Sequence, residues 1–270
     1  MKFVKIKIPK ITDHDTYFKS NDLGFFLNLN FRERAGAYHS GHLDKKKDSR
    51  KNIKPHPPDL TDLQFLHRII LLNKRTTVLE YGCGNSTLVM HDALLKNKRK
   101  YPKVWPRCVY PFQSYVVDNS RKYIEICKKK LTKFSKLNKL VTFKYSKIQM
   151  TTFNSRIANE YLSHPVINPD FILLDGPNNF TKIHYKKNGF HIGKDDLMPM
   201  NCDILKFENF LLPGTIIVSD GRTANVRFLV NNFQRNWVHI HLEKIDTHLL
   251  YLDEKPLGVY NKAQLDYYKK

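Results

Sequence analysis

The chain has 270 residues, of which 41% are hydrophobic and 12% aromatic, so it can fold around a core and is not a disordered protein. At this length we expect one domain with appended segments. No apolar run is long enough to cross a bilayer, and the N-terminus alternates charged and apolar side chains, unlike a signal peptide. The four cysteines show neither a disulfide pattern nor metal-ligand spacing. These features predict a reduced, cytoplasmic protein without a membrane span.

The 46 basic and 25 acidic residues give a formal net charge of +21. Sixteen of the basic residues but only two of the acidic ones lie between Lys96 and Lys147, so most of the excess charge is in this segment. A concentrated basic surface indicates an anionic partner, such as nucleic acid or a phosphorylated small-molecule or glycan substrate. It is equally typical of a solvated helix face, and both interpretations stay open.

Residues 1–55 show weak periodicity and end in a highly charged run, which indicates an N-terminal arm or linker. Prolines then separate this arm from an amphipathic helix predicted over residues 60–72, with Asp59 before its first turn. The predicted organisation is an arm at residues 1–55, a domain at 56–258 with an insertion at 97–113 and a substrate loop at 178–199, and a C-terminal tail at 259–270.

Short apolar runs alternate with helical patterns through the rest of the chain. We predict strands over residues 76–81, 114–118, 140–145, 171–175 and 215–219, and helices from residue 86 and over residues 120–134, 203–211 and 225–234. Two closing strands, at residues 237–245 and 248–253, are near enough in sequence to pair as a hairpin. This pattern predicts an α/β fold: a doubly wound, mostly parallel, seven-stranded Rossmann-like sheet with a C-terminal antiparallel hairpin.

Four of the predicted strands end at an acidic residue: Glu80, Asp118, Asp175 and Asp220. In a doubly wound sheet, ligands bind beyond the carboxyl ends of the strands, near the point where the strand order reverses. Carboxylates buried there are costly unless they have a partner. A bound ligand is the economical explanation for all four.

The first predicted strand is followed by a glycine turn. Gly82 and Gly84 permit a sharp turn and a close approach of the ligand to the backbone, and the helix that follows offers its N-terminal amides. Asp118 ends the next strand, where an acid accepts hydrogen bonds from ribose hydroxyls in nucleotide-binding folds. Because the third glycine of the dinucleotide pattern is missing, the turn favours an adenosine-containing ligand other than NAD.

Together these segments resemble class I S-adenosylmethionine-dependent methyltransferases over about residues 59–255. The resemblance is carried by Glu80-x-Gly82-x-Gly84, by residues 115–118, by residues 170–177 and by residues 212–220. It implies S-adenosylmethionine as cofactor, with contacts from the glycine turn and the two following strand ends. The implied cofactor-binding residues are Glu80, Tyr81, Gly82, Cys83, Gly84, Ser86, Asp118, Asn119 and Asp175, and residues 146–149 would flank the adenine.

Asp175 and Asp220 end adjacent strands at the expected acceptor site and are the candidate catalytic residues, together with His184 in the substrate loop. In the metal-dependent O-methyltransferases, acids at the places of Asp175 and Asp220 hold Mg²⁺, so a magnesium site formed by these two is one alternative. The other is that Asp175 positions the acceptor or acts as a base without a metal. Gly221 offers no ligand and departs from that family's pattern.

The leading functional hypothesis is O-methylation of a small-molecule or glycan-type hydroxyl acceptor. The second is 2′-O-methylation of RNA by a protein that uses the basic segment at residues 96–147. The third is a cofactor-binding protein of the same fold without catalysis. The aromatic motif of enzymes that methylate base amino groups is absent after residue 175, where Asp175 is followed by Gly176, Pro177 and Asn178. The acceptor and the oligomeric state are not specified by the sequence.

Overall fold

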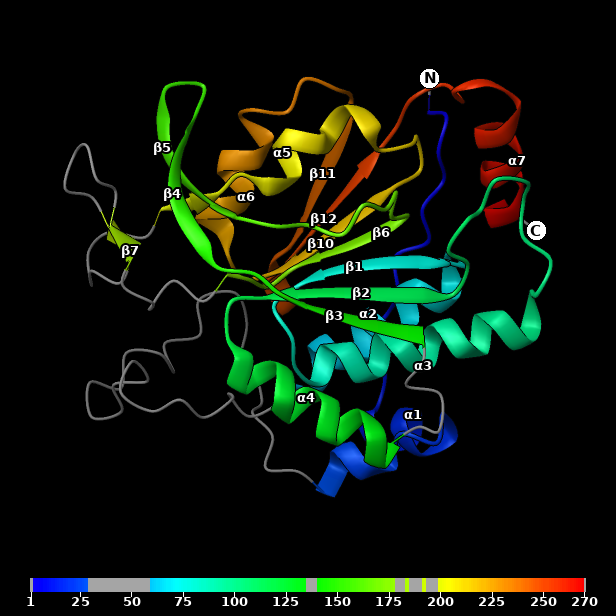
Figure 1. Cartoon of the computed structure of the whole chain (residues 1–270). Helices are drawn as coiled ribbons and strands as arrows, with labels where there is room; N and C mark the ends of the chain where they lie inside the picture. The colour runs from blue at the N-terminus through cyan, green and yellow to red at the C-terminus, as the bar shows by residue number, and fades with distance from the viewer. Residues whose placement is uncertain are drawn as a thin grey trace.

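The computed structural model describes residues 2–28, 59–134, 140–177, 183–184, 191–192 and 199–269. Their central feature is a seven-stranded sheet in the order β11-β12-β10-β6-β1-β2-β3 (Figure 1). The strands are β1 (Thr77–Tyr81), β2 (Gln113–Asp118), β3 (Val141–Tyr145), β6 (Phe171–Leu174), β10 (Ile216–Asp220), β11 (Trp237–Leu242) and β12 (Thr247–Leu252).

The sheet is doubly wound about β1. The chain passes from β1 to β2 and β3 on one side, then returns to β6 and β10 on the other, with parallel pairing throughout. β12 pairs antiparallel with both β10 and β11. The predicted mostly parallel sheet with a C-terminal antiparallel hairpin is therefore confirmed. The order reverses between β1 and β6, so this is where a ligand site is expected.

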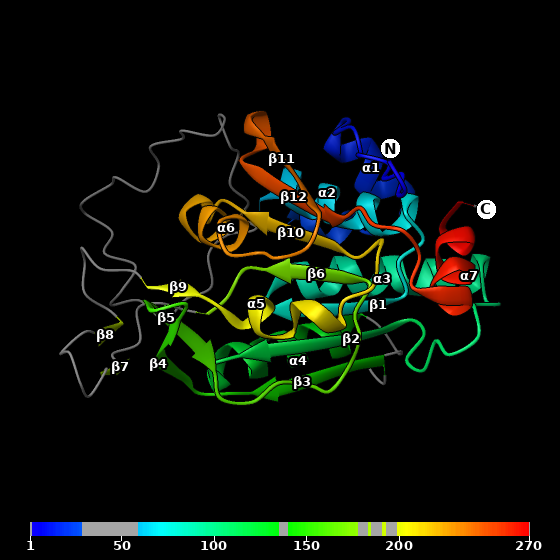
Figure 2. The same ribbon diagram turned by 90° about the horizontal axis from the view of Figure 1, so that it is seen from above.

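Helices cover both faces of the sheet (Figures 1 and 2). One face packs against α1 (His14–Ser20), the 3-10 helix η1 (Gly24–Asn28), α2 (Leu60–Leu72), α3 (Asn85–Lys100) and α4 (Arg121–Phe134). The other face packs against α5 (Asp203–Phe207), the 3-10 helix η4 (Glu208–Phe210) and α6 (Thr223–Val230). In the described ranges, no helix has the length and apolar character needed to cross a membrane.

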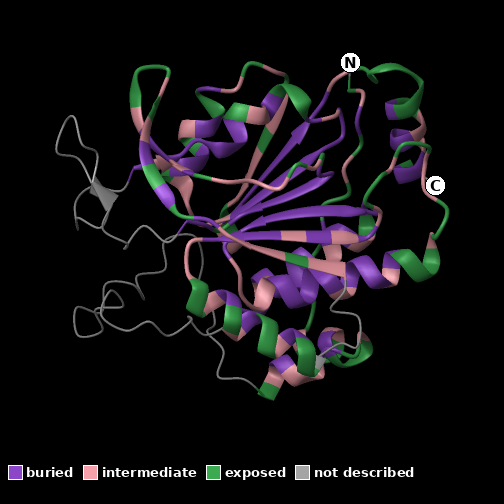
Figure 3. Ribbon diagram, in the orientation of Figure 1, coloured by how far each residue is buried: buried purple, intermediate pink, exposed green. Residues whose placement is uncertain are grey.

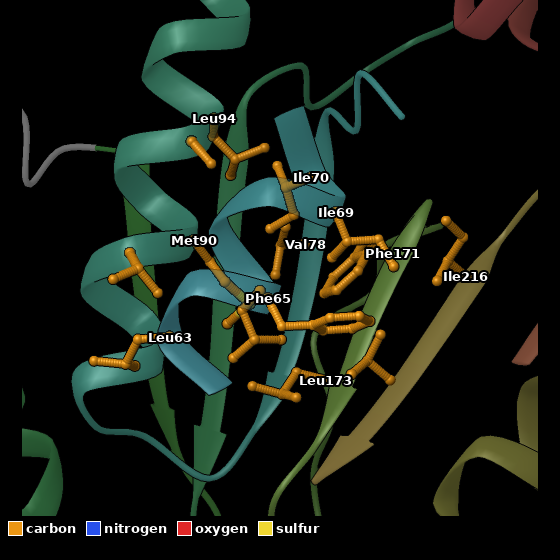
Figure 4. Close-up of a cluster of buried hydrophobic side chains, with 14 of the residues drawn as sticks. Leu63, Phe65, Ile69, Ile70, Val78, Met90, Leu94, Phe171, Leu173 and Ile216 are labelled. Atoms are coloured by element: carbon orange, nitrogen blue, oxygen red, sulfur yellow. The ribbon is translucent and has the colours of Figure 1, made fainter. Parts of the chain in front are cut away.

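The central strands β1, β6, β10 and β12 are buried on both faces, whereas the edge strands β3 and β11 are mostly half-buried (Figure 3). Alternate residues of each strand point into two different hydrophobic clusters, one on each face of the sheet. In β1, Val78 points into the cluster formed by α2 and α3, where it meets Phe65, Ile69 and Met90 (Figure 4). Its neighbour Leu79 belongs to the cluster on the α5 and α6 side.

A smaller sheet, in the order β4-β5-β9, was not predicted. It contains β4 (Ile148–Phe153), β5 (Arg156–Tyr161) and β9 (Met200–Asn201). Strands β4 and β5 form a hairpin whose two turn residues, Asn154 and Ser155, both have positive φ. Such turns favour Asn-Gly or Asp-Gly. Because serine stands in the second position here, the sequence signal for the hairpin is weak.

The C-terminal residues predicted as a tail contain a helix, α7 (Gly258–Lys269), with Leu265, Tyr267 and Tyr268 in the core. The buried guanidinium of Arg75 lies 4.0 Å from the Tyr268 ring centroid and donates to the carbonyl of Gly214 at 2.8 Å. The Tyr268 hydroxyl donates to Asp170 at 2.8 Å. These contacts attach α7 to the amino-terminal end of the central strands.

The described N-terminal segment lies across the fold without pairing as a strand. Asp253 accepts hydrogen bonds from the amides of Phe3 and Val4, each at 2.8 Å. Further along, Asn73 accepts from the amide of Lys7 at 2.8 Å. The segment is therefore held to distant elements by side-chain acceptors.

Candidate functional site

The glycine turn joins β1 to α3 and touches the end of β6. Gly82 has a φ of +89°, a left-handed conformation that favours glycine. A Cβ added to Gly176 would lie 2.6 Å from the Gly82 amide nitrogen and 2.5 Å from the Tyr161 hydroxyl, so no side chain fits between these two turns. At Gly84, the nearest atom to an added Cβ would be 3.9 Å away. The turn is thus closed toward β6 and open at Gly84.

Helix α3 starts directly after this turn, with Gly84 at its N-cap. The Gly84 amide donates to the hydroxyl of Thr87 at 3.2 Å. The first turn of α3 contains no acidic side chain, so nothing in this helix neutralises the positive end of its dipole. The open side of the glycine turn is therefore suited to an anionic group such as a carboxylate.

Glu80 is completely buried at the end of β1. Its Oε1 accepts a hydrogen bond from the Ser86 hydroxyl at 2.5 Å, while Oε2 is a buried atom without a hydrogen-bond partner among the described residues. Burial raises the pKa of Glu80 well above its ordinary value, and the hydrogen bond from Ser86 offsets only part of this effect. A cationic ligand group next to Glu80 would stabilise the ionised form of this buried carboxylate.

Asp118 is 3% exposed at the end of β2. It accepts a hydrogen bond from the amide of Ser120 at 2.6 Å. Burial raises its pKa, and hydrogen bonds from Ser120 and Cys83 partly counteract the rise. The side chain of Cys83 thus links the glycine turn to Asp118, and Cys127 of α4 donates to the carbonyl of Gly84 at 3.4 Å. Ser86 and Asn119 are both partly exposed beside these groups.

The acceptor side predicted from Asp175 and Asp220 contains a basic residue, Arg222, beside Asp175. The Nε of Arg222 lies 3.7 Å from Asp175 Oδ1, and the same guanidinium donates to the backbone carbonyls of Asp175 and Pro177. The Asp175 side chain is 54% exposed. Within the described residues, no further His, Cys, Asp or Glu joins Asp175 and Asp220 in a three-ligand cluster.

Two groups at this edge were missed by the sequence analysis. Tyr161, from β5, stacks on Tyr81 at 5.6 Å, and its buried hydroxyl lies beside Gly176. Burial raises its pKa well above the ordinary value, and the charge of Asp118 adds to the effect. His164 donates to or accepts from Tyr81 at 3.4 Å and lies 2.7 Å from Asp203. Both positions depend on the β4-β5 hairpin, for which the sequence signal was weak.

The structure describes only some of the remaining residues that were predicted to form the site. The amide of Ser146 donates to the carbonyl of Asp118 at 3.0 Å, so the residues predicted to flank an adenine do lie next to β2. His184 lies in the two-residue strand β7 (Ile183–His184), which pairs with β8 (His191–Ile192). Their side chains, and most of the predicted substrate loop, are outside the described residues.

No protein-family model matches the sequence, and no curated protein matches it significantly. Solved structures with a similar arrangement include an O-methyltransferase from Bacillus cereus in complex with S-adenosylhomocysteine, at 14% identity over 80% of this chain and 95% of that one, with a TM-score of 0.44. The methyltransferase PaMTH1 from Podospora anserina, bound to S-adenosylhomocysteine, gives 11% identity, 91% and 100% coverage and a TM-score of 0.46.

The fold assignment rests on the sheet itself. The strand order β3-β2-β1-β6-β10-β12-β11, with β12 antiparallel, makes this a doubly wound Rossmann-like sheet with a C-terminal antiparallel hairpin. The glycine turn follows β1 and the acid ends β2, as the resemblance in the sequence implied. The class of fold is therefore established by the chain's own topology.

Proposed function

We propose that this chain is an S-adenosylmethionine-dependent methyltransferase that acts on a hydroxyl group. The observation that carries the proposal is the position of three groups at the ends of two neighbouring strands. These are the buried Glu80 of β1, the turn from Gly82 to Gly84 at the start of α3, and the buried Asp118 of β2. Each supplies the chemistry that one part of the cofactor requires.

The described residues fit this cofactor. The carboxylate of Glu80, whose Oε2 has no hydrogen-bond partner among them, suits the cofactor's amino group, and the amides at the start of α3 suit its carboxylate. Asp118 is placed to accept hydrogen bonds from the ribose hydroxyls. When bound, the cofactor supplies an electrophilic methyl group on a sulfonium. The groups of this chain that would hold it come from Glu80, Tyr81, Gly82, Cys83, Gly84, Ser86, Asp118 and Asn119.

On the acceptor side, Asp175 is the candidate to orient the acceptor hydroxyl and take up its proton, which provides the positioning and base catalysis that methyl transfer needs. Arg222 already supplies a positive charge next to Asp175. The positive charge of Arg222 beside Asp175 disfavours Mg²⁺ at Asp175 and Asp220, so the proposed proton transfer uses no metal. The exposed side of Arg222 favours an acceptor that carries a phosphate or carboxylate, such as an acidic small molecule or glycan.

A second acceptor class, the ribose hydroxyl of RNA, is favoured by one observation. Helix α4 follows directly after Asp118, and its exposed side carries Arg121, Lys122, Lys129 and Lys133. A basic helix beside the cofactor site would bind a phosphate backbone near the reacting group.

Calorimetric titration with S-adenosylmethionine tests the proposal directly. We expect one site, and we expect Asp118→Ala to weaken binding at least tenfold because a charged acceptor of ribose hydrogen bonds is removed. Asp15→Ala is the matched control, since Asp15 is exposed on α1 and pairs with Lys19. Absence of binding to the folded wild-type protein would overturn the proposal. Binding without methyl transfer to any hydroxyl acceptor or RNA would leave a cofactor-binding protein.

A further inference from the structure

The hairpin of β11 and β12 carries a group of side chains that the proposed reaction does not use. His239 and His241 are two residues apart on β11, and His248 lies directly across from His241 on β12. Their neighbours Trp237 and Leu250 pack against the α6 side of the sheet, so the histidines face α6 as well. Asp246 closes the group from the turn between the strands.

Three of these side chains offer metal-binding atoms close together. One atom each from His241, Asp246 and His248 lies within 4.8 Å of the other two. The Nε2 of His241 is buried, has no hydrogen-bond partner among the described residues and lies 3.6 Å from Asp246 Oδ1. The rings of His241 and His248 stack at 4.0 Å. Among the described residues, this is the one cluster of at least three such ligands.

We propose that His241, Asp246 and His248 form a binding site for a divalent first-row transition-metal ion of the Zn²⁺ type. Two imidazoles and one carboxylate are the donor set that such ions prefer, whereas Mg²⁺ and Ca²⁺ take mainly oxygen ligands. Three protein ligands leave at least one coordination position for water or another ligand.

The backbone already places these ligands. The register of β11 and β12 fixes His241 and His248 as a cross-strand pair on one face. Asp246 has a φ of +46°, and its carbonyl accepts a hydrogen bond from the amide of Gly221 at 2.8 Å.

Binding requires a small contraction. Ligand atoms on one tetrahedral ion lie about 3.4 Å apart, so the present cluster must close by roughly 1 Å. His241 and Asp246 are both only about three-quarters buried and can move. His248 now bonds His239 through Nδ1 and Thr223 through Nε2, each at 3.0 Å. It would give up one of these bonds to the ion and keep the other, which then orients the ring.

This site is separate from Asp175 but is connected to the same loop. Gly221, which binds the Asp246 carbonyl, is followed by Arg222, which contacts Asp175. A metal that fixes Asp246 would therefore also fix the loop at residues 220–222. The proposal does not depend on methyl transfer, because it concerns binding of the metal alone.

The test uses full-length protein freed of metal with a chelator and then titrated with Zn²⁺ or Co²⁺ by calorimetry and absorbance. We expect one ion per chain and a rise in the thermal midpoint of several degrees with excess ion. His241→Ala and Asp246→Asn should each weaken binding at least tenfold. Asparagine also tolerates positive φ, so the second variant keeps the turn. Mg²⁺ should give neither binding heat nor a thermal shift.

Two controls separate this site from other metal-binding groups. His14→Gln removes a partly exposed histidine of α1, far from the hairpin in sequence, and should bind the ion like wild type. The Co²⁺ complex should lack thiolate charge-transfer absorption, which would instead reveal binding by Cys83 or Cys127. The proposal is overturned if the folded protein binds no ion, if both ligand variants bind with unchanged affinity, or if the thiolate band appears.

Discussion

At the scale of single residues, Glu80 shows a conflict between stability and binding. Its carboxylate is fully buried and accepts a hydrogen bond from Ser86. Since its pKa is raised in the folded state, this group contributes most favourably at pH values below its unfolded pKa near 4.5, and the contribution is lost as the pH rises through the folded pKa. Without its cofactor, the protein must therefore either bury a charged carboxylate or take up a proton at neutral pH, and both are unfavourable.

We predict that Glu80→Gln stabilises the cofactor-free protein by about 1–3 kcal/mol at pH 8, because the amide keeps the shape and avoids the buried charge. The same variant should bind S-adenosylmethionine at least tenfold more weakly, since the charge that faces the amino group is gone. Urea unfolding and calorimetry measure the two effects. A variant that is both less stable and unchanged in cofactor affinity would contradict this account.

The acidic residues at the strand ends could be predicted, because their positions follow directly from where each apolar run ends in the sequence. Glu80, Asp118 and Asp220 each occupy the last or second-to-last position of a strand with a clear apolar run. The positions of Arg222 and Tyr161 could not be predicted. Arg222 reaches Asp175 only because residues 47 apart in the chain are brought together by adjacent parallel strands.

At the scale of elements, Asp170 connects the first central strand with the last helix. Its carboxylate accepts hydrogen bonds from the amides of Thr76 and Thr77, each at 2.9 Å, and from the hydroxyl of Tyr268 at 2.8 Å. It is 2% exposed, and Tyr268 in turn packs on the buried cation of Arg75. One carboxylate thus satisfies donors from the start of β1 and from α7.

We predict that Asp170→Ala lowers the free energy of unfolding by about 3–5 kcal/mol, because it leaves the buried amides of Thr76 and Thr77 and the Tyr268 hydroxyl without their acceptor. Urea denaturation followed by circular dichroism measures the decrease. Asp266→Ala is the control in α7 itself: its carboxylate is about half-exposed and pairs with Lys269, so the change should be within about 0.5 kcal/mol. Equal effects of the two substitutions would refute the role assigned to Asp170.

The sequence predicted all seven strands of the central sheet, because the strands in its middle are buried on both faces and rich in apolar residues. It did not predict the β4-β5 hairpin or α7. Strands β4 and β5 are short and rich in polar residues, and the turn between them lacks glycine. In α7 the buried positions include Asn261 and Gln264, polar residues whose side chains hydrogen-bond to each other at 3.0 Å, so the helix has no clear apolar stripe.

At the scale of the whole molecule, the described residues include a buried histidine that couples stability to pH. His67 is fully buried and bonds Tyr17 at 2.6 Å and Asp92 at 2.9 Å. Burial lowers its pKa, and the hydrogen bond with Asp92 only partly opposes this. Its contribution to stability is therefore complete above the unfolded pKa of about 6.5 and falls as the pH drops through the folded pKa.

We predict that the urea midpoint decreases between pH 7.5 and pH 5, because the unfolded chain takes up a proton that folded His67 resists. In His67→Gln, this decrease should be smaller, although the variant is less stable at pH 7.5. A midpoint that rises on acidification, or an identical pH dependence in the variant, would contradict the assignment to His67.

The excess of positive charge leads to a testable prediction for the alternative in which the methyl acceptor is RNA. If α4 binds a phosphate backbone, the double substitution Lys129→Glu and Lys133→Glu should weaken RNA binding and make the logarithm of affinity less steep against the logarithm of salt, by about 1 for each phosphate that these lysines neutralise. Lys255→Glu with Lys262→Glu is the matched control, because it changes the net charge equally at exposed positions near or on α7. Equally weakened binding by both pairs would indicate attraction by net charge alone.

The bonds from Asp253 to Phe3 and Val4 have a consequence for biosynthesis. The donors and the acceptor are separated by 250 and 249 positions, so these two amides have no native acceptor until residue 253 has been translated. Contacts of such long range form slowly. We therefore expect this segment to dock after the sheet is complete, which leaves it accessible to chaperones and proteases on the nascent chain until then.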